Sequence, residues 1–317
     1  MPGPDHQNFV RYLEAKKSID GRALNQGVWQ RMAELLRDLQ QNGSVAILEV
    51  GCAIGTMVER MLERGLLTRA AYTAIDLRPE LIAEAKTRLR RYADRQGFGT
   101  REGAGGALVL ERPGQAVLLD LIASDLFDVA GPDRPDRLYD LILAHAFLDL
   151  VDLDSALRRI LSLTHPGGLL YFSLNYDGAT IFEPQIHPAL DRQIEELYHQ
   201  TMDLRQTGRA PSRMSRTGRR LLVSLTRAGL PILSAGSSDW VIHPRSGGYS
   251  PDEAYFLHFI IQTIHEALTG RPDLDQSSLG EWIAERHRQV EKGLLVYIAH
   301  QVDVLAEVPE KRNALDQ

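Results

Sequence analysis

The 317-residue sequence contains a single cysteine, Cys52, so neither an internal disulfide nor a cysteine-based zinc cluster can form within it. It has no apolar run long enough to span a bilayer, and no basic segment followed by an apolar one near its start. Its formal net charge of −6 argues against a general binder of nucleic acid or anionic membranes. We therefore expect a cytoplasmic protein that binds neither nucleic acid nor membrane.

The most informative stretch of the chain runs from Val45 to Met57. Val45 to Val50 is apolar except for Glu49, which is typical of a buried strand. Gly51 and Gly55 follow, and an amphipathic helix begins directly after them. Such a turn brings backbone N–H groups close to a ligand at the carboxyl edge of a sheet. No Lys-Ser/Thr pair follows the glycines, so a P-loop for phosphate is excluded.

An acidic residue follows at the end of the next apolar run. Ala71 to Ile75 is apolar, and Asp76 comes directly after it, 21 residues beyond Gly55. A carboxylate at this position is placed to bind a ribose diol. Both a dinucleotide and S-adenosylmethionine carry such a diol, so the pattern to this point admits either.

The glycine turn resembles a known signature. Glu49-Val-Gly-Cys-Ala-Ile-Gly55 is similar to the E/D-x-G-x-G-x-G motif of class I S-adenosylmethionine-dependent methyltransferases, with Ala53 in place of the middle glycine. NAD-binding loops normally carry three glycines as G-x-G-x-x-G, which this segment lacks. The resemblance implies an enzyme that uses S-adenosylmethionine as cofactor and releases S-adenosylhomocysteine. Its motifs cover residues 44–176, and the remainder matches by pattern only.

The resemblance also implies a fold. The family has an α/β, Rossmann-like, doubly wound and mostly parallel sheet of seven strands in the order 3-2-1-4-5-7-6. We expect the fifth strand at Leu169–Leu174, the sixth at Ile232–Val241 and the seventh at Leu294–Val302. A hairpin is expected at Ala107–Leu110 and Val117–Ile122, around an Arg-Pro-Gly-Gln turn.

The expected domain organisation has three parts and two helical insertions. Two amphipathic helices form an N-terminal helical cap, and a short tail follows the last strand. The first insertion directly follows the fifth strand, which suits a lid or a substrate region. The boundaries are 1–43 for the cap, 44–305 for the methyltransferase domain, 306–317 for the tail, and 177–217 and 244–293 for the insertions.

The resemblance assigns residues to the cofactor. In the family, an Asp after the third strand binds the adenine amino group beside an apolar neighbour, and Asp125 with Leu126 matches that pair. The alternative for Asp125 is a helix N-cap. The residues expected at the cofactor are Glu49, Gly51, Cys52, Ala53, Gly55, Asp76, Leu77, Asp125, Leu126 and His145.

Methyl transfer is an in-line displacement, so holding donor and nucleophile in line provides most of the acceleration. A general base helps when the acceptor is a hydroxyl or an ammonium. His145, at the end of the expected fourth strand, is the first candidate because its usual pKa suits neutral pH. Asp149 and Asp177 are weaker candidates. The alternatives are a structural bond from His145 to a backbone carbonyl and a simple turn at Asp177-Gly178.

Other residues are candidates for contact with the acceptor. We expect Asn175, Tyr176, Trp240, Tyr12 and Arg22 there, whereas the alternative for the aromatic residues and for Arg22 is ordinary packing. A group of arginines either holds an anionic part of the acceptor or forms a solvated face. Its members are Arg205, Arg209, Arg213, Arg216, Arg219 and Arg220. No metal is predicted, although three aspartates keep a Mg²⁺-assisted reaction open; they are Asp149, Asp152 and Asp154.

The acceptor class is narrowed by what the sequence lacks. The fourth strand ends in Ala144-His-Ala-Phe147, unlike the Asp/Asn-Pro-Pro-aromatic run of enzymes that methylate base amines, and no Pro-Cys pair is present. The leading hypothesis is methyl transfer to an O or N of a small-molecule acceptor. The alternatives are a non-catalytic nucleoside-binding regulatory protein and a nicotinamide-dependent oxidoreductase, and the glycine spacing disfavours the second.

Overall fold

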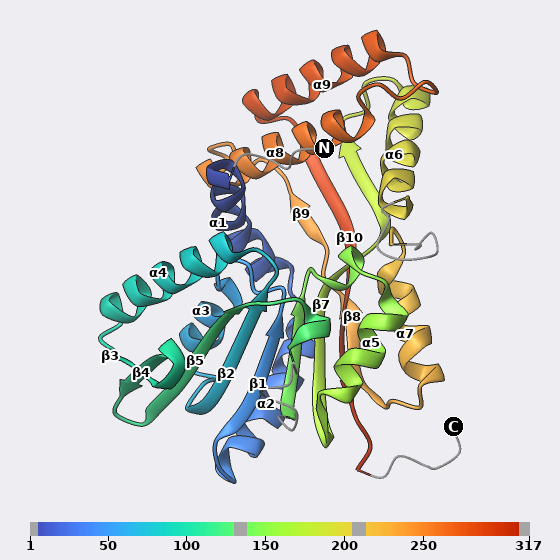
Figure 1. Ribbon diagram of the computed structural model, residues 1–317. Helices are drawn as coiled ribbons and strands as arrows, with labels where there is room; N and C mark the ends of the chain where they lie inside the picture. Colours follow the sequence, from blue (N-terminus) through green and yellow to red (C-terminus); the bar gives the residue numbers. More distant parts are fainter. Residues whose placement is uncertain (1–5, 130–137, 205–213, 311–317) are drawn as a thin grey trace.

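The computed structural model describes residues 6–129, 138–204 and 214–310. In this part of the chain, ten strands form one sheet, with helices packed against it (Figure 1). The helices are α1 (His6–Ala23), α2 (Gln26–Gln41), α3 (Thr56–Glu63), α4 (Pro79–Arg95), α5 (Leu153–Ser162), α6 (Pro188–Asp203), α7 (Thr217–Arg227), α8 (Pro251–Leu268) and α9 (Gln276–Glu291). The strands are β1 (Val45–Val50), β2 (Arg69–Asp76), β3 (Gly99–Glu102), β4 (Leu108–Arg112), β5 (Gln115–Ala123), β6 (Tyr139–His145), β7 (Thr164–Glu183), β8 (Ile232–Ser237), β9 (Trp240–Ile242) and β10 (Val296–Glu307).

The strand order confirms the expected fold. The sheet runs β3-β4-β5-β2-β1-β6-β7-β10-β8, with β9 paired to β10. Its central part, β5-β2-β1-β6-β7-β10-β8, is the order 3-2-1-4-5-7-6, and β3 and β4 extend one edge. From β5 to β7 the neighbours are parallel, whereas β10 is antiparallel to both β7 and β8. The predicted hairpin is present as β4 and β5, with Gly114 in a left-handed conformation (φ 80°) at its turn.

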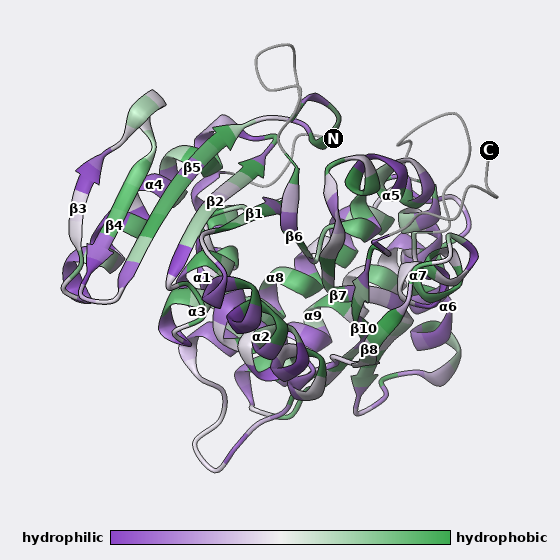
Figure 2. Ribbon diagram, turned by 90° about the horizontal axis from the view of Figure 1, so that it is seen from below, coloured by the Kyte–Doolittle hydropathy of each residue, from purple (hydrophilic) through white to green (hydrophobic). Residues whose placement is uncertain are grey.

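The helices bury one face and expose the other, as their sequences predict. Figure 2 shows hydrophobic and hydrophilic residues alternating around α1 and α2. Val28, Met32 and Leu36 of α2 are buried in the main core beside the sheet. α8 begins at a capping box, in which Ser250 and Glu253 each bond the other's backbone N–H. In the described ranges, every helix is too short or too polar to cross a lipid bilayer.

Two strands differ from the sequence prediction, one in its length and the other in its continuity. The fifth strand was expected to end at Leu174, but β7 continues to Glu183 and pairs along most of its length with β10. Leu174 has a left-handed backbone (φ 55°), as does Gly178 (φ 77°), and the register between β7 and β10 shifts twice. These irregularities break the period-2 pattern, so residues 175–178 look like a turn in the sequence. The expected sixth strand is also interrupted, because β8 ends at Ser237 and β9 begins at Trp240.

The distal halves of β7 and β10 carry a second apolar core. Phe182 and Tyr297 of these strands are buried together with residues of α6, α8 and α9. Figure 1 shows α1, α8 and α9 beyond one end of the sheet, where these two strands project. The two expected insertions therefore supply α6 on one side and α8 and α9 on the other, and residues 205–213 of the first lie outside the described residues.

A buried ion pair joins α6 to α9. The Asp191 carboxylate accepts hydrogen bonds from Arg286 Nη2 at 2.7 Å and from Trp282 Nε1 at 2.6 Å. Those two bonds go to Oδ1, and Oδ2 accepts hydrogen bonds from the backbone N–H groups of Ile186 and His187 at 3.0 Å. Asp191 and Arg286 are both buried, so each charge depends on the other for its solvation.

We predict that Asp191→Ala lowers the free energy of unfolding by about 3 kcal/mol or more, because Arg286 is left as an uncompensated buried charge. Urea unfolding followed by circular dichroism measures the change. Asp273→Ala is the matched control: its carboxylate pairs with Arg271 at the exposed surface, and its removal should have no resolvable effect. Equal stability of the two variants would contradict the assignment.

Candidate cofactor and active site

A cavity of about 630 Å³ lies at the carboxyl edge of the sheet. One side of it consists of the segments that follow β1, β2, β5 and β6, and the other side consists of α1, α6, α8 and parts of β7, β9 and β10. Its volume is in the range of small-molecule sites, and its place is where ligands bind in open α/β sheets.

The glycine turn after β1 forms part of the cavity wall and requires left-handed backbone three times. Gly51 has φ 72°, Ala53 φ 47° and Gly55 φ 76°. Ala53, at the position of the middle glycine, thus adopts a conformation that side-chain-bearing residues seldom take. A Cβ on Gly51 would lie 2.6 Å from Cδ2 of Phe147, so a side chain there would collide with the loop after β6. Cys52 is buried, and its N–H donates to the carbonyl of Ile75.

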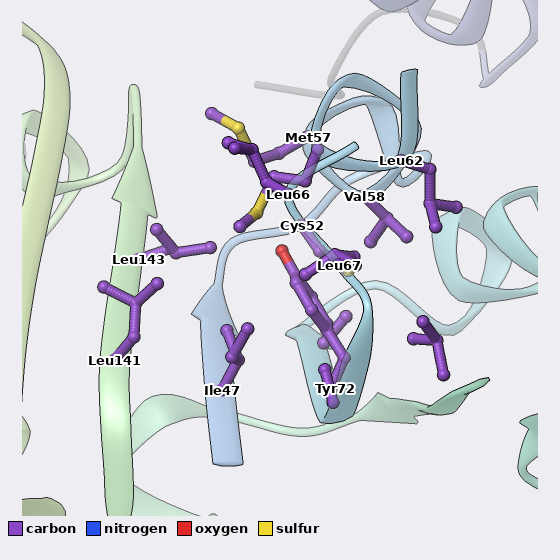
Figure 3. Packing of buried hydrophobic residues seen from close by; sticks show 14 of the residues in the cluster. Ile47, Cys52, Met57, Val58, Leu62, Leu66, Leu67, Tyr72, Leu141 and Leu143 are labelled. Carbon is purple, nitrogen blue, oxygen red and sulfur yellow. The ribbon is translucent and has the colours of Figure 1, made fainter. Parts of the chain in front are cut away.

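Glu49 is a buried carboxyl group at the end of β1. Its Oε2 accepts a hydrogen bond from the hydroxyl of Tyr72 at 2.8 Å. Figure 3 shows the Tyr72 ring with its oxygen toward the loop that carries Cys52. Burial raises the pKa of Glu49 to about 8, although the Tyr72 bond and the charge of Arg60 lower it. A cationic ligand beside Glu49 would stabilise its ionised form.

Asp76 lies at the end of β2 and is fixed by the backbone. Its Oδ2 accepts from the N–H of Ala53 and its Oδ1 from the N–H of Arg78, both at 3.0 Å. Each oxygen keeps a further lone pair, so the carboxylate can also accept hydrogen bonds from a diol in the cavity. Leu77 follows it, lines the cavity and is 69% exposed.

Asp125 combines the two roles that the sequence left open. Its side chain accepts from the N–H of Phe127 and caps the short 3₁₀ helix Leu126–Asp128, and it also lines the cavity. Leu126 lines the cavity as a buried residue. Phe127 and Leu150 line it while remaining 47% and 48% exposed. An apolar ring placed between these exposed side chains and Leu77 would cover surface that water now contacts.

His145 lies at the end of β6 with both ring nitrogens bonded. Nδ1 is 2.8 Å from Ser173 Oγ, and Nε2 is 3.2 Å from Asp20 Oδ2. Burial lowers the pKa of His145 to about 4, so the ring is neutral at pH 7. Asp20 has a pKa of about 2, because Lys16 and His145 favour its charged form against the effect of burial. An ionised Asp20 only accepts, so Nε2 donates to it and Nδ1 accepts from Ser173.

Asp20 and Lys16 of α1 belong to the site and were missed in the sequence. Lys16 Nζ lies 2.6 Å from Asp20 Oδ2, and Trp240 Nε1 donates to Asp20 Oδ1 at 2.9 Å. The two residues are four apart on an amphipathic helix, a spacing typical of a solvated surface pair. In the structure both are buried and line the cavity, because α1 packs against α8 and β9 and forms part of the cavity wall.

The remaining predicted residues divide into two groups. Tyr12, Tyr176, Trp240 and Asp149 line the cavity. Three others do not, because their side chains are engaged elsewhere. Asn175 Nδ2 donates to the carbonyl of Val302 within the sheet. Asp177 is buried in an ion pair with Arg219 at 2.9 Å. Arg22 pairs with Glu253 at 2.6 Å.

Two further groups were considered in the sequence: the arginines that could hold an anionic part of the acceptor, and the three aspartates that could bind Mg²⁺. Within the described residues, the structure does not gather either group into one site. Arg205, Arg209 and Arg213 lie outside them. Asp152 caps α5 through the N–H of Ser155. Within residues 6–129, 138–204 and 214–310, no three His, Cys, Asp or Glu side chains are grouped so as to hold a metal ion.

Residues 48–170 match a family model described as a methyltransferase domain. This segment begins inside β1 and ends inside β7, so it contains the glycine turn, Asp76, Asp125 and His145. The match assigns residues 48–170 to a methyltransferase domain. The glycine motif and Asp76 predict S-adenosylmethionine as the methyl donor. Among curated proteins, no sequence matches the chain.

Several solved structures are similar to the methyltransferase at low identity. The [4+2]-cyclase SpnF is 19% identical, with a TM-score of 0.40, over 89% of this chain and 82% of its own. The plantazolicin methyltransferase BpumL, in complex with a triazolic desmethylPZN analog and SAH, is 16% identical, with a TM-score of 0.39, over 95% and 85%. An S-adenosylmethionine-dependent methyltransferase from Thiobacillus denitrificans, in complex with S-adenosyl-L-homocysteine, is 12% identical, with a TM-score of 0.45, over 89% and 92%.

The raised pKa of Glu49 predicts a pH-dependent affinity for S-adenosylmethionine, whose sulfonium and ammonium groups favour the ionised carboxylate. Below about pH 8 the free enzyme carries the proton, which binding must release, so affinity should rise with pH by up to about tenfold per unit and level off above that pH. Calorimetric titration of the wild type and of Glu49→Gln at each pH isolates this effect, because titration of the ligand cancels in the ratio of affinities. A ratio that does not change with pH would show that Glu49 carries no linked proton.

Proposed function

We propose that the enzyme transfers the methyl group of S-adenosylmethionine to an O or N of a small-molecule acceptor. The observation that supports this proposal is the continuity of the cavity. Its sheet side has the glycine turn, Asp76 and Asp125. Its opposite side, made by α1, α6, α8, β7, β9 and β10, is mostly apolar and aromatic, and the paired Lys16 and Asp20 are its charged side chains. Donor and acceptor can therefore lie in contact in one enclosed space, which is the main requirement of an in-line displacement.

The residues on the sheet side suit the parts of S-adenosylmethionine. Asp76 suits the ribose diol, and the turn from Gly51 through Cys52 and Ala53 to Gly55 gives close access to backbone. Asp125, with Leu77 and Leu126 beside it, suits the adenine. Glu49 suits the cationic amino-acid end, and Lys16 offers a cation for its carboxylate. Of the residues named here, all but Gly55 line the cavity.

His145 is placed to orient other groups. Its ring is hydrogen-bonded to Asp20, and the Asp20 carboxylate in turn accepts hydrogen bonds from Lys16 and Trp240. As a general base it would have to accept a proton at Nδ1, whose lone pair faces Ser173. We therefore propose a positioning role for His145, and its role as a base remains a prediction from the sequence. Asp149 lines the cavity and stays a second candidate for the base, whereas Asp177 is engaged by Arg219 away from the cavity.

We predict that His145→Ala weakens S-adenosylmethionine binding by about tenfold, because Asp20 loses a hydrogen bond and no longer fixes Lys16. His145→Gln keeps a donor near the position of Nε2 and should bind close to wild-type strength. Calorimetry measures both affinities, and the pH profile of turnover tests the alternative. If the Gln variant binds normally yet loses turnover and its pH dependence, His145 is a base.

The acceptor class is tested with S-adenosylmethionine that carries a labelled methyl group. A cell extract is separated into low-molecular-mass and macromolecular fractions, and each is incubated with the enzyme. We expect label in the low-molecular-mass fraction only. Asp76→Ala should reduce the transfer about tenfold or more through loss of cofactor binding, and Asp94→Ala, which removes an exposed carboxylate of α4, should not. Label in protein or nucleic acid alone would refute a small-molecule acceptor, and tight binding of NAD⁺ in place of S-adenosylmethionine would refute methyl transfer itself.

A further inference from the structure

Apart from the paired Lys16 and Asp20 of α1, the half of the cavity that faces the cofactor side has no charged side chain. It is lined by Tyr12, Leu174, Tyr176, Thr180, Tyr198, Met202, Trp240, Phe259, Ile260, Thr263, Tyr297, Ala299 and Gln301. We call these residues the acceptor wall. Six of them are aromatic, and they come from α1, β7, α6, β9, α8 and β10. An aromatic wall of this kind favours a flat, apolar ligand.

The charges at the border of the acceptor wall do not favour a charged acceptor. Lys16 and Asp20 lie 2.6 Å apart and neutralise one another. Asp149, in the segment after β6, also lines the cavity, and its carboxylate would repel an anion. Burying an ion without a partner costs several kcal/mol, so carboxylate, phosphate and ammonium acceptors are disfavoured.

The acceptor wall contains a hydrogen-bonded path from the cavity toward the surface. The hydroxyl of Tyr176 lies 2.7 Å from Thr180 Oγ1 and 2.7 Å from His199 Nε2. Tyr176 lines the cavity and is buried, whereas His199, on α6, does not line it and is half-buried. The path therefore begins at a residue that lines the cavity and ends at a histidine that water can reach.

We propose that the acceptor is an uncharged, apolar, aromatic molecule with a hydroxyl nucleophile, and that Tyr176 and His199 carry away its proton. This inference rests on the proposed function. Tyr176 is then a catalytic residue that touches the acceptor, and His199 acts through it.

The step balances without a further reactant. The acceptor oxygen forms a bond to the methyl carbon while the bond from that carbon to sulfur breaks, and its electron pair stays on sulfur as a thioether. The acceptor hydroxyl proton passes to the oxygen of Tyr176, and the proton of Tyr176 passes to Nε2 of His199. The resulting imidazolium then releases its proton to water.

The surroundings of Tyr176 and His199 agree with proton transfer from the tyrosine to the histidine. Burial raises the pKa of Tyr176, so it remains a neutral phenol that both accepts and donates. Burial also lowers the pKa of His199, so its neutral form is available at neutral pH, although Asp203 and Glu196 raise that pKa. The titratable or charged groups that act on the pair are Asp149, Glu195, Glu196, Tyr198, Asp203 and Arg216.

The acceptor class is tested by fluorescence titration of the enzyme saturated with S-adenosylhomocysteine. The probes are 2-naphthol, naphthalene and 2-naphthoate, which share one skeleton. We expect 2-naphthol to bind, naphthalene to bind about tenfold more weakly because it lacks the hydroxyl, and the anion not to bind. Tyr176→Phe should remove the preference for naphthol over naphthalene. Tyr255→Phe, which removes an α8 hydroxyl outside the cavity, should keep it.

The proton path is tested by turnover with S-adenosylmethionine and 2-naphthol. His199→Gln should lower kcat about tenfold or more with little change in KM, and kcat of this variant should lose the dependence on pH that titration of His199 gives the wild type. The same pH profile in both proteins, full activity of His199→Gln, or binding of naphthol without methylation in the wild type would overturn the path. If S-adenosylhomocysteine binds but 2-naphthol does not, the acceptor class is wrong while the donor site stands. If S-adenosylhomocysteine does not bind, the proposed function itself fails.

Discussion

The carboxylate of Asp303 holds together the three segments on which the cavity depends. It is fully buried in β10, and it accepts hydrogen bonds from the N–H of Leu174 at 2.7 Å and from the N–H of Asn25 at 2.9 Å. Leu174 is where the backbone of β7 turns left-handed, and Asn25 separates α1 from α2. One side chain thus satisfies the donors exposed at a strand irregularity and at the joint of two helices, which would otherwise be buried without partners.

The hydrogen bonds of Asp303 to β7 and to the turn between α1 and α2 explain how the sheet acquires the second side of its cavity. Because β7 and β10 stay paired beyond the carboxyl edge of the central strands, they form a support that α6, α8 and α9 can cover. The same edge that offers the glycine turn and Asp76 to a cofactor therefore faces an apolar wall. α1, which packs against α8 and β9, brings Lys16 and Asp20 into contact with His145 and Trp240. The charged groups of the cavity are thus near the cofactor side, and the acceptor wall is neutral.

Much of the fold and part of the site could be predicted from the sequence. The central strand order was implied by the family resemblance, and the structure has it. The glycine turn, Asp76 and the hairpin before Asp125 depend on short patterns within one segment, and the structure has each of these as well. The length of β7 was not predictable, because Asn175, Asp177 and Gly178 are polar or flexible residues whose pattern indicates a turn. Asp177 and Arg22 are as polar as catalytic residues, but their ion pairs with Arg219 and Glu253 take them out of the cavity.

The sequence by itself determined the sheet side of the cavity, because the turn after β1 and the carboxylates after β1 and β2 act through local geometry that the backbone fixes within a few residues. Only the tertiary structure decided the opposite side and the contacts made there. Lys16, Asp20, Tyr176, His199 and Trp240 come from segments far apart in the chain, and each is an ordinary residue in its own segment. Their meeting depends on the extended strands and on the helices that cover them, and no local pattern carries that information.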